Sequence, residues 1–270
     1  MADAVPDSLR AVLNRAAALE RFQVAHRAPA ADLAWLADYH WILRWDLGEG
    51  GTHRQRVLTH PSVHLTFISD GRARVDGVVR GVFTETIEGR GRVIGVRFRP
   101  GGLRPILGAP VSTITDRRVP VEGIFGREAR AVADAIIATP EPGDAILLAE
   151  DLLRSAAPDR PDPLVLEASA VVDRIAADPA LTRVDRLAAA AGVSTRRLQR
   201  LFADYVGVGP KWVIRRYRMQ DAADRAAHGT DVDWADVAAD LGYADQAHFT
   251  RDFTATIGMS PARYARSCAR

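Results

Sequence analysis

Basic side chains gather in one short stretch near the C-terminal end of the chain. Residues 196–218 contain one acidic residue, Asp204, and seven basic ones: Arg196, Arg197, Arg200, Lys211, Arg215, Arg216 and Arg218. The balance then reverses, since residues 221–245 contain seven Asp and one arginine, Arg225. Guanidinium groups bind phosphate oxygens through paired N–H donors. We therefore expect one face of this region to meet phosphate, although the net charge of the whole chain is only +2.

No set of residues has the spacing of a known catalytic site. A GxSxG nucleophile motif is absent, and no pair of carboxylates stands out. The RPGG sequence at 99–102 lacks the spacing and the lysine of a phosphate-binding loop, and it more closely fits a turn into a short helix at 103–107. Cys268 is the single cysteine. The sequence therefore predicts neither an enzyme nor a bound cofactor.

Three histidines, His53, His60 and His64, lie close enough in sequence to be considered as metal ligands. No carboxylate or cysteine completes a recognisable ligand set with them. We expect surface or partly buried histidines and no metal, with a metal or ligand site as the alternative.

Aromatic residues cluster between positions 35 and 45, where Trp35, Tyr39, Trp41 and Trp45 accompany His40. Aromatic walls are common in ligand pockets, so these four residues form a candidate pocket. They could equally form the seam between a helix and a β-barrel, which is the arrangement we favour.

A pattern that occurs twice supplies the elements that would present the basic residues. The first copy consists of Ala188, Gly192, Leu198, Phe202, Gly207 and Pro210, and the second of Ala238, Gly242, Phe249, Phe253, Gly258 and Pro261. A small residue followed four positions later by glycine and then by an amphipathic helix is what a helix-turn-helix needs. The alanine lets two helices cross closely, and the glycine permits a turn with positive φ. Two such units indicate a protein that reads DNA with two helices.

Length and composition allow two soluble domains. The chain has 270 residues, of which 47% are hydrophobic and 26% charged, and it contains no run of eighteen apolar residues. The first fifteen residues do not have the pattern of a signal peptide. These observations favour a cytoplasmic protein without contact to a membrane.

The N-terminal part, residues 1–156, is predicted to be a sensor or dimerisation domain of α+β class. Helices are expected at 7–21 and 31–39, and two more between 121 and 155, split at 139–143. Between them the β-branched residues and glycine-bounded turns predict a small antiparallel barrel or sandwich, with strands at 41–47, 54–59, 63–69, 73–79, 81–87 and 92–98.

A proline-rich linker, residues 157–163, leads to an all-α part at 164–270. There the first helix-turn-helix is expected at 184–190 and 194–205, with Ser194 as N-cap, and the second at 234–241 and 245–256, with Asp245 as N-cap. A long helix at 210–228 joins the two units. Further helices are expected at 164–177 and 261–266.

Residues 164–266 resemble the DNA-binding part of AraC/XylS-type transcription regulators. The segment LGYADQAHFTRDFTATIGMSPARYAR resembles the C-terminal signature of that family, and GVSTRRLQRLFADYVGVGP resembles its first helix-turn-helix. Val213 departs from the family, which usually has an aromatic residue there. More loosely, RFRPGGLRPILGAPVSTITD at 97–116 is similar to part of a reduced cupin-like sensor domain. No cysteine precedes Cys268, so the methyl-accepting activity of some relatives is excluded.

The resemblance implies which residues meet DNA, by matching position to position. Base contacts are expected from Arg196, Gln199 and Arg200 in the first unit and from Gln246, His248, Thr250 and Arg251 in the second. Ala247 stands where relatives often have a polar contact residue. Phosphate contacts are expected from Ser194, Thr195, Arg197 and Arg215. Because the first copy is more basic, we expect it to read the sequence and the second mainly to position the protein.

The function expected from these observations is that of a DNA-binding transcription regulator with double-stranded DNA as partner. Modulation by a small-molecule effector or by homodimer formation through the N-terminal part, and contact with RNA polymerase, are also expected. Two alternatives stay open. One is a ligand-binding protein or enzyme with an appended helical DNA-binding module, and the other is a regulator whose N-terminal part only pairs subunits.

Overall fold

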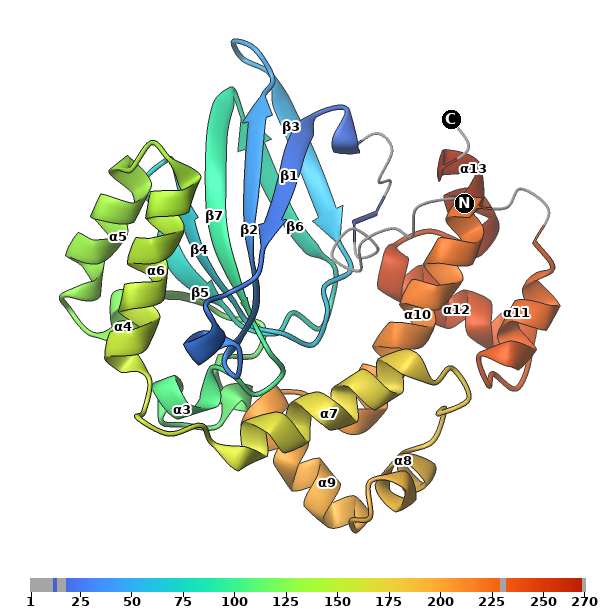
Figure 1. Ribbon diagram of the computed structural model, residues 1–270. Coiled ribbons are helices and arrows are strands. Elements are labelled where there is room, and N and C mark those ends of the chain that lie inside the picture. Colours follow the sequence, from blue (N-terminus) through green and yellow to red (C-terminus); the bar gives the residue numbers. More distant parts are fainter. Residues whose placement is uncertain (1–11, 14–17, 229–231, 269–270) are drawn as a thin grey trace.

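The computed structural model describes residues 12–13, 18–228 and 232–268 (Figure 1). The predicted helix at 7–21 lies for the most part outside these residues. Within the described residues, strands occupy the N-terminal part and helices follow, as the sequence predicts.

Six antiparallel strands form the main sheet, in the order β1-β2-β7-β4-β5-β8. Their bounds are β1 Phe22–Arg27, β2 Ala37–Asp46, β4 His64–Ile68, β5 Ala73–Asp76, β7 Arg90–Phe98 and β8 Arg118–Pro120. Two further strands, β3 Thr52–Val57 and β6 Phe83–Glu88, form a separate two-stranded sheet. The result is an open sandwich of two unequal sheets rather than a closed barrel.

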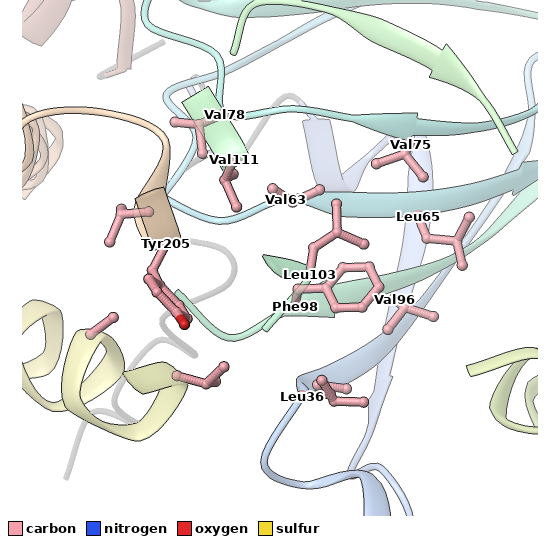
Figure 2. Packing of buried hydrophobic residues seen from close by; sticks show 14 of the residues in the cluster. Leu36, Val63, Leu65, Val75, Val78, Val96, Phe98, Leu103, Val111 and Tyr205 are labelled. Atoms are coloured by element: carbon pink, nitrogen blue, oxygen red, sulfur yellow. The ribbon is translucent and has the colours of Figure 1, made fainter. Parts of the chain in front are cut away.

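Alternating residues of the main sheet face two different layers. From β2, His40 and Ile42 point toward the helices, while Tyr39 and Trp41 point toward the two-stranded sheet. This period of two is typical of a strand that is covered on both faces. Figure 2 shows the helix-facing side chains of the sheet, Leu65, Val75, Val96 and Phe98, together with the loop residues Leu36 and Leu103.

Helices cover one face of the main sheet (Figure 1): α4 Glu122–Phe125, α5 Ala129–Ala138 and α6 Pro142–Ala156. Helix α6 is joined to the sheet by a buried polar pair, since His40 Nε2 lies 3.0 Å from Glu150 Oε1. The same oxygen accepts the backbone N–H of Ala30 at 2.8 Å. Burial lowers the pKa of His40 and favours the neutral imidazole, although the Glu150 carboxylate acts in the opposite direction.

The helices of the C-terminal part follow the order expected from the repeated pattern. They are α7 Pro163–Ala177, α8 Val184–Ala190, α9 Thr195–Leu201, α10 Pro210–His228, α11 Trp234–Asp240, α12 Gln246–Ile257 and α13 Pro261–Cys268. Helix α10 lies between the α8–α9 pair and the α11–α12 pair (Figure 1).

Several predicted elements differ from the observed ones. The helix expected at 31–39 is a 3-10 turn, η1 Ala31–Leu33, followed by β2, because the alternating burial that begins at Ala37 fits a strand. Strands β1 and β8 were not predicted, and the 121–155 region forms three helices instead of two. The single helix expected at 194–205 is α9 followed by a π-turn, Phe202–Val206, which ends at Gly207.

The two parts of the chain share one hydrophobic cluster. It continues from the sheet through Leu103 and Val111 into Val206 and Ile214. Polar contacts reinforce this junction: Arg104 Nε donates to Asp204 at 2.8 Å, and Thr115 Oγ1 donates to the Gly207 carbonyl at 2.7 Å. The first helix-turn-helix is therefore fixed directly to the N-terminal part.

Candidate functional sites: two helix-turn-helix units and a buried cavity

The first helix-turn-helix is α8 and α9, connected by a turn at Gly192. Gly192 has φ 67°, a left-handed conformation that favours glycine. The Ser194 hydroxyl then accepts the backbone N–H of Arg197 at 3.2 Å and caps α9. Leu198, on the inner face of α9, is fully buried. The predicted turn and cap are thus confirmed.

The outer face of α9 carries the residues that the sequence singles out. Thr195, Arg196, Gln199 and Arg200 are all exposed. Arg197 is exposed as well, but its Nη2 donates to both carboxylate oxygens of Glu167, at 2.8 and 2.9 Å. To bind a phosphate, Arg197 would have to give up its ion pair with Glu167. The side chains of Arg196, Gln199 and Arg200 face solvent.

The second unit repeats this geometry in α11 and α12. Gly242 forms the turn with φ 76°, and the Asp245 carboxylate accepts the backbone N–H of His248 at 2.6 Å as the N-cap of α12. Phe249 and Phe253 are fully buried. The second turn and cap are confirmed too.

The outer face of α12 is less basic than that of α9. Gln246, Ala247, His248 and Arg251 are exposed, and Thr250 is half-buried. The His248 ring packs edge-on against Tyr243, with 5.1 Å between ring centres. Among these side chains Arg251 is the single cation, so α12 offers a weaker attraction for phosphate than α9.

Arg215 links α10 to α12. Its Nη2 lies 2.7 Å from Asp252 Oδ1, and the Tyr243 hydroxyl donates to the other oxygen of Asp252 at 3.1 Å. Sequence reasoning treated Arg215 as a phosphate contact and did not identify Asp252 as its partner. The pair places Arg215 beside the second recognition helix, where one acidic neighbour already compensates its charge.

Two members of the basic stretch are buried, so the basic face is smaller than the sequence suggests. Arg218 donates to the carbonyls of Ile175, in the last turn of α7, and Asp178, directly after α7, at 2.7 and 2.8 Å. Arg216 Nη2 lies within hydrogen-bond distance of the carbonyls of Val79, Arg80 and Gly81, and its guanidinium lies over the Trp212 ring. Burial lowers the pKa of Arg216 to about 10. These two side chains therefore join α10 to other segments of the fold and are not available to DNA.

A cavity of about 200 Å³ lies between the two sheets. Of the four aromatic residues proposed as a pocket, Tyr39 and Trp41 line it and the other two do not. Trp35 packs against the main core, while Trp45 stacks over Gly91 and donates its indole N–H to the Glu88 carbonyl at 3.0 Å. Trp41 and Trp45 lie on the same face of β2, with Trp45 near the end of the strand, whereas Trp35 precedes β2, which begins at Ala37.

The three histidines do not form one set. His60 and His64 line the cavity, whereas His53 lies 3.1 Å from Gln55 Oε1 and packs edge-on against Phe22. Among the described residues, no group of three or more His, Cys, Asp or Glu side chains is arranged to hold a metal ion. His26, which the sequence did not single out, also lines the cavity.

His64 makes the stability of the protein sensitive to acid. Burial first, and then the charges of Arg97 and His60, lower the pKa of His64 from 6.5 to about 3, and the Trp41 ring covers it edge-on. Below about pH 6.5, His64 is therefore protonated in the unfolded chain but stays neutral in the folded protein.

We expect the contribution of His64 to the free energy of unfolding to be fully present above pH 6.5. As the pH falls from 6.5 to 5, this contribution should decrease by about 2 kcal/mol. Urea unfolding of the wild-type chain and of a His64→Asn variant at both pH values measures this effect. An equally large fall in the variant would show that His64 is not the group responsible.

No helix of the described residues is long and apolar enough to cross a membrane.

Two parts of the chain match known protein families, and the chain is similar to known transcription factors. Residues 187–267 match the family described as "Helix-turn-helix domain", and residues 25–120 match a "Domain of unknown function (DUF6597)". The chain is 30% identical over 220 residues to the transcriptional activator NphR of a Rhodococcus species, covering 80% of this chain and 58% of that protein. It is 32% identical over 82 residues to the probable transcription factor PqrA of Proteus vulgaris, covering 30% of this chain and 66% of that protein.

The chain thus spans less than two thirds of the length of these two relatives. Among solved structures, apo ToxT of Vibrio cholerae matches with a TM-score of 0.42 and 12% identity, over 90% of this chain and all of that one. The family match at residues 187–267 covers the same residues that form the two capped units on either side of α10. The C-terminal part of the chain is therefore an AraC-type helix-turn-helix domain.

Proposed function

We propose that the protein is a sequence-specific DNA-binding transcription regulator. Its two recognition helices, α9 and α12, enter adjacent segments of the major groove about one helical turn apart. The observation that carries this proposal is the repetition of one local geometry, in which a left-handed glycine and a side-chain cap start a helix with a buried apolar face and an exposed polar one. The transcription factors among its relatives support a regulator rather than an enzyme.

The N-terminal part, residues 1–156, acts in this proposal as the sensor or dimerisation domain, and residues 164–270 act as the DNA-binding domain. The buried cavity is the place for an effector, and a change in the relative placement of the parts would transmit its binding. Homodimer formation, contact with RNA polymerase and a cytoplasmic location belong to the same proposal.

Selection of bound sequences from random DNA at moderate salt tests the proposal. We expect the full chain to recover one motif with two parts, separated by about one turn of the duplex. Recovery of no motif would overturn the proposal and favour a ligand-binding protein or enzyme whose helical part has another role.

The two units are proposed to contribute unequally, and Arg200 tests the stronger one. Arg200 is exposed in the last turn of α9, and its guanidinium can bond guanine O6 and N7 together. Arg200→Ala is expected to weaken binding to the selected site by about 1–3 kcal/mol and to relax one base position. Competition binding against selected and random DNA measures both effects.

Arg130→Ala is the matched control, because Arg130 is exposed on α5 in the N-terminal part and pairs with Asp134. It should leave both affinities unchanged. Equal losses on selected and random DNA for Arg200→Ala would identify Arg200 as a phosphate contact instead.

A further inference from the structure

The second helix-turn-helix contains a chain of three polar side chains on the flank of its recognition helix. The Tyr243 hydroxyl donates to Asp252 Oδ2 at 3.1 Å, and Asp252 Oδ1 lies 2.7 Å from Arg215 Nη2. Tyr243 belongs to the turn before α12, Asp252 to α12 and Arg215 to α10. Three separate elements therefore meet at one carboxylate.

The first unit has apolar residues at the positions that correspond to Tyr243 and Asp252. When the two copies of the repeated pattern are aligned, Val193 takes the place of Tyr243. Leu201, which is buried, takes the place of Asp252. The shared scaffold thus forms without polar groups at these two positions, so the polar groups of the second unit serve a purpose of their own.

The hydroxyl of Tyr243 is held in place from the buried side of the unit. The Tyr243 ring packs edge-on against that of Phe249, with 5.4 Å between ring centres, and Phe249 is fully buried. Burial, followed by the charge of Asp252, raises the pKa of Tyr243, so the hydroxyl stays protonated and donates its hydrogen. One oxygen of the Asp252 carboxylate is therefore fixed by a well-packed donor.

Exposure increases along the chain toward Arg215. The Asp252 side chain is 23% exposed and that of Arg215 is 45% exposed. A guanidinium has five N–H donors in one plane, so the donor that meets Asp252 leaves others for a second anion. By contrast, Arg218 of the same helix pairs with Asp221 but is only 2% exposed. Arg215 is thus fixed by a carboxylate and still accessible to a phosphate.

Arg215 borders the face of α12 that is expected to enter the major groove. Asp252 comes four residues after His248, and residues four apart in a helix lie on the same side. His248 itself is exposed. In helix-turn-helix complexes the recognition helix lies in the groove while neighbouring segments contact the phosphates at its edge. An arginine beside this face is therefore suitably placed for a phosphate contact.

We propose that Tyr243 and Asp252 are positioning residues that hold Arg215 in the orientation required to contact a DNA phosphate. This inference rests on the proposed function, because it concerns the contact of the second unit with DNA. An arginine side chain loses rotamer freedom when it binds, and a carboxylate that already orients it removes part of that loss. Asp252 therefore strengthens DNA binding, although its own charge repels phosphate.

Competition binding of the full chain to its selected DNA site, at several salt concentrations, tests this proposal. Arg215→Gln should weaken binding about tenfold and reduce the slope of log affinity against log salt by about 1. Tyr243→Phe changes no charge and should weaken binding about threefold, and Asp252→Asn should weaken it as well. Charge repulsion alone predicts tighter binding for Asp252→Asn. Asp236→Asn removes an exposed carboxylate of α11 and, as the matched control, should not weaken binding.

An Arg215→Gln background separates positioning from folding. In that background Tyr243→Phe and Asp252→Asn should weaken binding no further, whereas a loss of structure in the second unit would weaken binding in either background. If Asp252→Asn does not fold, Tyr243→Phe in the two backgrounds decides the question. Unchanged binding by Tyr243→Phe, or equal losses in the two backgrounds, would overturn this inference alone. A wild-type chain that selects no DNA motif would overturn the proposed function itself.

Discussion

Phe253→Ala is expected to lower the free energy of unfolding of the second helix-turn-helix by about 3–5 kcal/mol. Phe253 is fully buried in α12, with its ring 5.7 Å from that of Phe249 and 5.9 Å from that of Tyr264. The substitution would leave a cavity between α12 and α13 that the surrounding helices cannot fill. Urea unfolding followed by circular dichroism measures the change.

The neighbouring Thr254 provides the matched control. Its side chain is exposed and its hydroxyl donates to the Thr250 carbonyl of the same helix at 2.7 Å. Thr254→Ala should change the free energy of unfolding by no more than about 0.5 kcal/mol. A loss below about 1 kcal/mol for Phe253→Ala would contradict the packing described for α12.

The second large effect is expected at Gly207, which ends the first recognition segment with φ 91°. A Cβ atom there would lie 3.0 Å from Val111 Cγ1 and 3.3 Å from the Val111 carbonyl carbon, so backbone as well as side chain would have to move. Gly207→Ala is expected to cost about 3 kcal/mol, from the left-handed conformation and the close contacts together.

Gly258 is the natural comparison, since it occupies the same place in the second unit with φ 87°. Its Cβ would meet only the flexible end of Arg56, at 3.1 Å. Gly258→Ala should therefore cost about 1 kcal/mol, which is the conformational part alone. Equal losses in the two variants, measured by chemical unfolding, would show that the contact of Gly207 with Val111 has no energetic weight.

The helix-turn-helix units could be predicted from sequence because their determinants are local. Gly192 and Ser194, or Gly242 and Asp245, lie within a few residues of the turn and cap that they form. A left-handed turn and a side-chain cap depend on the residue types themselves. The exposure of Arg196, Gln199 and Arg200 follows from the same local helix, because Leu198 fixes which face is buried.

Features that depend on distant segments could not be predicted in this way. Arg216 contacts carbonyls about 136 positions earlier in the chain, and nothing near it in sequence distinguishes it from the exposed Arg215. Trp35 is separated from the other aromatic residues because β2 begins only at Ala37, and Trp41 and Trp45 are accommodated over two glycines of the neighbouring strand β7, Gly95 and Gly91. The histidines share a cavity only because β1, β4 and the segment before β4 meet in the sandwich.

Helix α10 takes part in two hydrophobic clusters. Val213, Ile214 and Tyr217, in its first half, belong to the cluster of the sheet and the first helix-turn-helix, whereas Ala222 and Ala226, in its second half, belong to the cluster of the second unit. Proteins open locally in cooperative units that follow such clusters. We therefore expect the second unit to open as a separate cooperative step that releases its contact with Leu58, while the first recognition helix stays packed against the sheet.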